Sequence, residues 1–136
     1  MADITVTAAQ VGIVYPNAIV YDFVASAAVT AGQAVYQTSA GKVAPADANA
    51  AGKQQFRGIA LKAAGAGEPV SVLKEGHCYG FGVSALNADA LLYLSDTEGA
   101  LADGAGTMTV IAGRVFALPD GTKIAYISAD WLRAWS

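Results

Sequence analysis

A degenerate internal repeat constrains the fold of this chain more than any other feature of its sequence. Residues 31–73 are echoed by residues 88–127 at an offset of about 55 residues. The matched positions are Tyr36 with Tyr93, Gly41 with Gly99, Gly58 with Gly113, and 70–73 with 124–127. Two similar strand-turn-strand units, rich in Ala and Gly, leave little room for a catalytic cleft. The repeat therefore favours a structural or binding module.

Short stretches of strand-like alternation, separated by turn residues, follow one another along the chain. The expected strands are 19–24, 33–37, 42–44, 56–61, 69–72, 78–83, 91–94, 108–118 and 123–127. Gly41 and the Pro119-Asp120-Gly121 sequence supply turn chemistry between them. Frequent short strands of this kind predict an all-β fold, a small β-sandwich or barrel built from the two similar units with little helix.

The first residues form a separate segment. Ile4 and Val6 alternate with polar residues, and Gly12 and Pro16 then interrupt the pattern. We therefore divide the chain into an extended segment, 1–16, and one β-rich domain, 17–136, which contains both copies of the repeat. The segment is either an arm that pairs with a neighbouring chain or an edge strand of its own domain, and Ile4 and Val6 are candidate interface residues.

Composition favours burial against other chains. The 136 residues suffice for one domain, 54% of them are hydrophobic, and only 14% are charged. The net charge of −3 is spread without a basic stripe, so direct nucleic-acid binding is not expected. No apolar run approaches the roughly 18 residues of a membrane span, so no membrane partner is expected either. We expect a cytoplasmic product that enters an assembly.

The residue types needed for common enzyme chemistries are scarce. His77 is the one histidine and Cys78 the one cysteine, and adjacent strand residues point to opposite faces, so a Cys-His pair is disfavoured. We expect a histidine near a turn and a buried thiol instead. One histidine and one cysteine also cannot supply a structural zinc site. The sequence thus predicts no enzyme, no catalytic residues, no cofactor and no metal.

Two further segments lie outside the strands. Residues 45–55 lack both strand and helix periodicity and predict an exposed loop. The C-terminal tail contains Trp131, Arg133 and Trp135, and Trp and Arg are enriched at interface hot spots. These three are candidate interface residues. The tail either docks on a partner or caps the core of its own chain.

Four segments of the first copy and its flanks resemble the head decoration, or capsid cement, proteins of tailed bacteriophages. They are 30–36 (TAGQAVY), 41–47 (GKVAPAD), 56–61 (FRGIAL) and 66–73 (AGEPVSVL). The resemblance implies a small β-rich homotrimer that binds the outer surface of an expanded phage capsid. There it would bridge major capsid protein subunits and stabilise the head, with no catalytic residues. It implies synthesis in the host cytoplasm and a final location in the virion, on the outer capsid surface.

Other functions remain compatible with the residues. The first alternative is another virion or surface structural module, such as a tail, fibre or adhesin domain that binds a receptor or glycan. The second is a small β-barrel enzyme or ligand carrier, which would need a concave polar pocket. Saturable binding to purified heads favours the decoration protein, whereas binding to glycans or cells favours the adhesion module.

Overall fold

The computed structural model describes residues 2–136 and confirms an all-β protein. Ten strands and one 3-10 helix occur among these residues, and no α-helix is present in this part of the chain. In chain order the elements are η1 (Ala8–Gln10), β1 (Gly12–Ile13), β2 (Ile19–Val24), β3 (Ala34–Gln37), β4 (Val43–Pro45), β5 (Phe56–Ala60), β6 (Pro69–Tyr79), β7 (Leu91–Leu94), β8 (Leu101–Ala102), β9 (Ile111–Ala117) and β10 (Lys123–Ser128).

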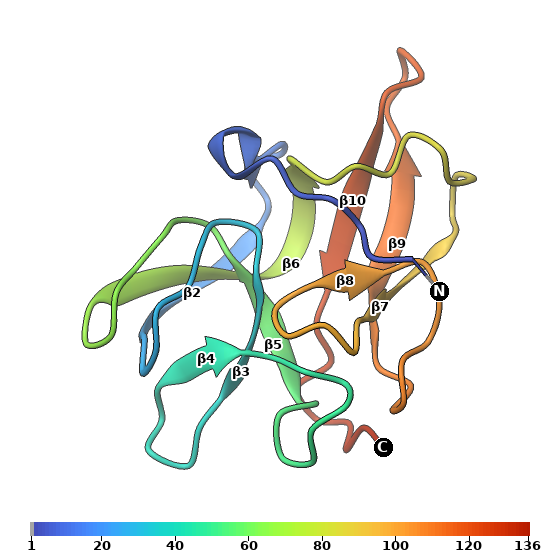
Figure 1. Cartoon of the computed structure of the whole chain (residues 1–136). Coiled ribbons are helices and arrows are strands. Elements are labelled where there is room, and N and C mark those ends of the chain that lie inside the picture. The colour runs from blue at the N-terminus through green and yellow to red at the C-terminus, as the bar shows by residue number, and fades with distance from the viewer. Residues whose placement is uncertain (1) are drawn as a thin grey trace.

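The strands form one curled sheet in which every pairing of named strands is antiparallel. The path runs β4-β3-β5-β6-β10-β9-β7-β8, and β1 and β2 pair with β6 outside this path. Figure 1 shows the result, with the β3-β4-β5 half and the β7-β8-β9 half curling on either side of β6 and β10. The long strand β6 therefore belongs to both halves.

The two copies of the repeat have the same strand order. In unit 1, β2 pairs with the first half of β6, followed by β5, β3 and β4. In unit 2, the second half of β6 pairs with β10, followed by β9, β7 and β8. Each unit thus begins one strand earlier than the sequence repeat indicates, and β6 ends one unit and opens the next.

Local irregularities are repeated as well. A bulge between Val35 and Tyr36 in β3 has its counterpart between Leu92 and Tyr93 in β7. By strand pairing, Leu73 in unit 1 is equivalent to Tyr126 in unit 2. The sequence alignment instead matches Leu73 with Ile127, so the two alignments differ by one residue. Because strand side chains alternate between faces, this one-residue offset decides which face of the sheet each side chain of unit 2 occupies.

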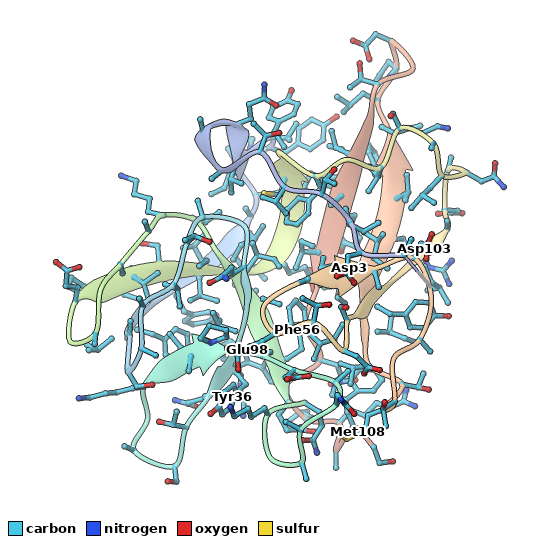
Figure 2. The ribbon with its side chains drawn as sticks, in the orientation of Figure 1. Asp3, Tyr36, Phe56, Glu98, Asp103 and Met108 are labelled. Carbon is cyan, nitrogen blue, oxygen red and sulfur yellow. The ribbon has the colours of Figure 1, made fainter. Side chains whose placement is uncertain are left out.

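In unit 1, strand β5 and the part of β6 that faces it are buried on both faces, whereas β2 is largely exposed. Ile59 and Leu73 project into the main core, which lies between the two units and also contains Phe56, labelled in Figure 2. Ala60 and Val72 project to the other face, into a smaller apolar cluster. That cluster is completed by residues of the same unit and its loops, namely Ala25, Val29, Val35, Val43, Ala64 and Val70.

Unit 2 is buried on one face only. Val115 and Ala125, the counterparts of Ala60 and Val72, belong to the main core. Arg114 and Tyr126 correspond to the buried Ile59 and Leu73 but lie on the opposite, outer face, where Arg114 is exposed and Tyr126 half-buried. The outer face of unit 2 is therefore the sheet surface that lacks the cover its counterpart has.

The N-terminal segment lies along its own chain. The alternating residues around Ile4 and Val6 form no named strand but two isolated bridges, Asp3 with Ala102 and Val6 with Phe81. The backbone N–H of Ile4 donates to the carbonyl of Leu101 at 2.8 Å, and the Ile4 side chain is buried in the main core. Residues 2–7 thus form an irregular edge of the same domain in this structure.

The prediction of an exposed loop over residues 45–55 is wrong for its first part. Ala46 and Ala48 are completely buried, and Ala48 bonds through its backbone to Ser95 and Met108 of unit 2. Alanine is small enough for the chain to pass between the units, and this close packing is invisible to a periodicity argument. Exposure is confined to the turn around residues 49–52.

Glycine at the repeat position in β9 is required by backbone packing. A Cβ at Gly113 would overlap the carbonyl oxygen of Tyr126 on β10, and the equivalent Gly58 faces Leu73 in the same way. We expect Gly113→Ala to lower the free energy of unfolding by about 2 kcal/mol, because the ladder must open to admit the methyl group. Urea denaturation measures this change.

Gly12→Ala is the matched control, because a Cβ at Gly12 meets no atom within 4 Å. Equal stability of the Gly113 variant and the wild-type protein would contradict this role of the repeated glycine.

Candidate interaction surface

The outer face of unit 2 carries a group of aromatic side chains around His77. The imidazole ring lies 4.3 Å from the Phe116 ring, 4.8 Å from Tyr126 and 4.9 Å from Tyr15, measured between centroids. β6, β10 and β9 place His77, Tyr126 and Phe116 on one face of the sheet, and the segment after β1 lays Tyr15 across them. With Tyr79 of β6, these residues form what we call the aromatic face.

Much of this surface is open to solvent. Tyr15 and Phe116 are each 37% exposed and Tyr79 is 43% exposed, and Ile13 on the neighbouring edge strand is 41% exposed. Single exposed apolar side chains are common, whereas a contiguous group of aromatic rings is a candidate contact surface. Aromatic side chains contribute large apolar areas at low conformational cost, which suits binding to another protein.

The aromatic face continues into a hollow of about 350 Å³. Tyr126 and Arg114 line it from the sheet, and the chain after β10 adds Asp130 and Trp135. Arg114 also donates a hydrogen bond from Nη1 to the carbonyl of Asp89 at 2.8 Å, which holds its guanidinium at the rim. The hollow thus combines aromatic walls with one positive and one negative group.

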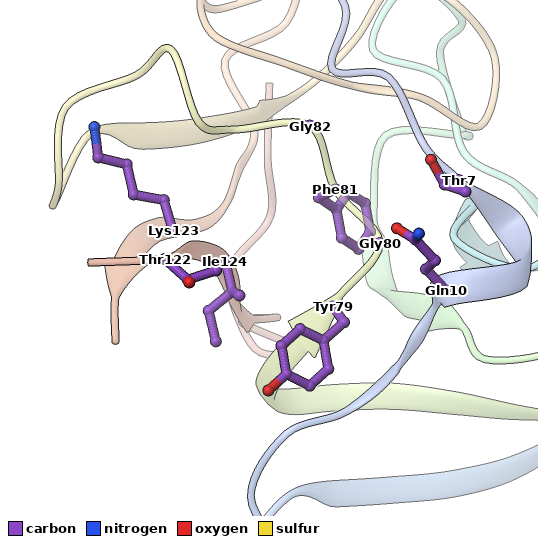
Figure 3. Close-up of a pocket in the computed structure, with 9 residues that line it drawn as sticks. All are labelled: Thr7, Gln10, Tyr79, Gly80, Phe81, Gly82, Thr122, Lys123 and Ile124. Carbon is purple, nitrogen blue, oxygen red and sulfur yellow. The ribbon is translucent and has the colours of Figure 1, made fainter. Parts of the chain in front are cut away.

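A second pocket, of about 440 Å³, lies between the N-terminal segment and the ends of β6 and β10 (Figure 3). Its lining includes Gln10, Tyr79, Phe81 and Lys123. The Lys123 ammonium group donates at 2.6 Å to the carbonyl of Leu86, so it is already engaged. The lining residues include no carboxylate and no histidine.

The structure separates His77 and Cys78 as the sequence predicted. Cys78 is buried in the main core, and burial raises the pKa of its thiol to about 11. His77 projects to the opposite face. The expectation that His77 lies near a turn is wrong, because it is an interior residue of β6. Among residues 2–136, no group of three or more potential metal ligands is present.

The C-terminal tail contacts its own chain. Trp135 is buried, with 5% of its surface exposed, and belongs to the main core. The Trp131 ring lies 4.9 Å from that of Tyr21, and its Nε1–H donates at 2.9 Å to the carbonyl of Arg57. Arg133 is exposed, with its guanidinium 4.4 Å from the Trp135 ring centre. The two tryptophans therefore anchor the tail.

The candidate interface residues from the sequence are not brought together. Ile4 and Val6 line one hollow beside the β7-β8 turn, whereas Trp131, Arg133 and Trp135 lie at the other end of the chain. Ile4 and Trp135 are buried within the monomer, so no partner is needed to cover them. Val6 (36% exposed) and Arg133 remain accessible.

Sequence reasoning missed the aromatic face. One signal was present: Phe116 follows Arg114 at a spacing of two, so both side chains point to the same face of β9. A charged residue marks that face as solvent-facing, and Phe116 then becomes an exposed aromatic residue. The contribution of Tyr15, in contrast, depends on the path of the chain between β1 and β2.

The buried thiol has a direct chemical consequence. We expect Cys78 in the native protein to be unreactive toward a disulfide reagent at pH 8, because the thiolate is scarce below a pKa of about 11 and the side chain is inaccessible. Spectrophotometric titration with the reagent tests this, and denaturant should restore full reaction. Rapid reaction without denaturant would contradict the burial.

His77 makes folding stability depend on pH. Partial burial among rings lowers its pKa below the ordinary value of about 6.5, so the unfolded chain binds a proton more readily than the folded chain. Stability should therefore decrease as the pH falls from about 6.5 toward the folded pKa. The non-titrating variant His77→Phe should lose this part of the pH dependence in thermal melts, and an unchanged pH profile would contradict the assignment.

No helix among residues 2–136 is long and apolar enough to cross a membrane. No protein-family model matches the chain, and no curated protein is significantly similar to it.

Proposed function

We propose that this protein is a structural virion protein that binds the outer surface of an expanded phage capsid as a trimer. In this role it bridges major capsid protein subunits and stabilises the head. The observation that supports the proposal best is the aromatic face, a broad apolar surface of unit 2 that the chain leaves uncovered. The resemblance of residues 30–73 to phage decoration proteins points the same way.

The aromatic face is suited to contact with the capsid. An aromatic side chain can bury about 150–250 Å². Covering the exposed two-fifths of Tyr15, Tyr79 and Phe116 therefore stabilises a complex by several kcal/mol at about 25 cal/mol per Å². Association costs offset part of this, so one copy binds modestly. Three linked copies bind the lattice together, and avidity makes the attachment firm.

Cement action requires only selective binding. A protein that binds the assembled lattice but not free subunits stabilises the lattice by mass action. No reacting group is needed, and the proposed role includes no enzymatic activity and no cofactor. The inaccessible Cys78, the separation of His77 from it, and a pocket lining around Gln10 and Phe81 without carboxylate or histidine support this part of the proposal.

One observation favours the alternative of an adhesion module. The hollow beside the aromatic face places Arg114, Asp130 and Ser128 next to the rings of Tyr126 and Trp135. Hydrogen-bonding groups beside aromatic rings are the chemistry that recognises sugars. Glycan binding that is lost in Arg114→Ala, without any binding to heads, would favour this alternative.

The capsid proposal predicts a specific effect of charge on the aromatic face. We expect wild-type protein to saturate purified expanded heads that lack it, at a fixed stoichiometry, in a sedimentation assay. Phe116→Asp should weaken this binding at least about tenfold, because an ionised carboxylate opposes desolvation of the face.

Val24→Asp on β2 is the matched control, since Val24 is 39% exposed, close to the 37% of Phe116. Absence of saturable binding by the wild-type protein would overturn the proposed function. Equal binding by the Phe116 and Val24 variants would overturn the role of the aromatic face.

A further inference from the structure

The tail presents one fully exposed leucine. Leu132 is 99% exposed and therefore has almost no contact with the rest of its chain. Leucine in such a position exposes its whole apolar side chain to water, a cost that contact with a partner would remove. It lies directly between the anchored Trp131 and the exposed Arg133.

The backbone on both sides of Leu132 is held firmly. Asp130 accepts hydrogen bonds from the N–H groups of Leu132 and Arg133 at 3.1 and 3.3 Å. Gln55 donates to the carbonyl of Arg133 at 2.8 Å and accepts from the N–H of Trp135 at 2.7 Å. Leu132 thus projects from a turn that is fixed before any partner arrives, which lowers the entropy cost of binding.

The same chain contains a hollow that suits a leucine. It measures about 250 Å³ and lies between the N-terminal segment, the loop before β3 and the β7-β8 turn. Ile4, Val6, Ala31 and Ala100 give it apolar walls, and Glu98 is the one charged residue in its lining within the described chain. Figure 2 labels Glu98 near the centre of the view, away from the C-terminus marked in Figure 1. Leu132 does not line the hollow, so this tail does not fill it in its own chain.

The charges around the two features are complementary. Arg133 follows Leu132, and Glu98 lies at the hollow. Glu98 already faces Lys53 at 3.5 Å, but both side chains are about half exposed, and a pair of this kind contributes little. The Glu98 carboxylate is therefore free to accept a second cation. Arg133 can supply this cation from its position close to the Trp135 ring.

We propose that Leu132 of one copy inserts into the hollow lined by Ile4 and Val6 of the next copy, with Arg133 beside Glu98. This contact rests on the proposed trimer and names the residues that form it. It joins two different patches and is therefore a heterologous contact, the type that a three-fold ring requires. The aromatic face then remains available for the capsid.

Cysteine cross-linking tests the contact directly. The variant Val6→Cys with Leu132→Cys should form disulfide-linked dimers and trimers under oxidising conditions, and these should return to monomers on reduction. Native Cys78 is buried and does not interfere. Val24→Cys with Leu132→Cys is the control and should stay monomeric. If the double variant remains monomeric, the contact is overturned. A wild-type protein that is itself monomeric would lead to the same result.

Substitutions at the contact provide an independent measurement. Leu132→Ser should raise the dissociation constant of the trimer at least about tenfold in light scattering and leave the monomer folded, because the side chain is exposed in the single chain. Arg133→Glu and Glu98→Arg should each weaken the trimer, and their combination should restore it. If the wild-type protein is a trimer and these substitutions leave it intact, the contact is overturned but head binding is not. Trimers that cross-link as expected and yet do not bind heads would instead overturn the proposed function.

Discussion

The structure depends on β6, because both repeat units pair along this one strand. Its first half lies between β2 and β5, and its second half pairs with β10 and β1. At Gly76, near the change of partners, a Cβ would lie 2.8 Å from the Cβ of Ala18 and 3.1 Å from a methyl group of Leu73. Glycine there lets the segment before β2 approach β6 closely. The relative position of the two units is thus fixed by a continuous hydrogen-bonded strand and not by a linker.

Stacking two copies of one unit in this way makes their surroundings unequal. The face of unit 1 that carries Ile59 and Leu73 packs on the inner face of unit 2, and together they form the main core. Each unit then has one outer face, and that of unit 1 is covered over β5 and β6, with Val29 and Ala64 among the covering residues, although β2 stays exposed. Terminal faces of stacked repeats need such a cover or a partner. The exposed Phe116 is therefore a consequence of the architecture.

The sequence predicted the fold class and the repeat because both depend on short-range patterns. Alternation and turn residues placed β2 and β7 at their observed bounds, and the aligned Gly58 and Gly113 have the same packing role. The sharing of β6 between units could not be predicted, since it depends on which distant strands pair. The aromatic face was missed although the spacing of Arg114 and Phe116 was a signal, and the position of Tyr15 depends on the chain path between β1 and β2. The burial of Ala46 and Ala48 depends on contacts between units, which no local pattern records.

The two proposed contacts differ in the physics that they use. The aromatic face is broad and is defined by ring side chains, with no acidic or basic side chain among them apart from the imidazole. Its contribution to binding therefore comes from apolar area, which is non-directional. The tail contact is small but places one aliphatic side chain and one charge at defined positions, and charge complementarity fixes orientation more than it adds affinity. A lattice-binding trimer needs both properties. The tail and its hollow would set the three-fold geometry, and that geometry would present three apolar faces to the capsid at once.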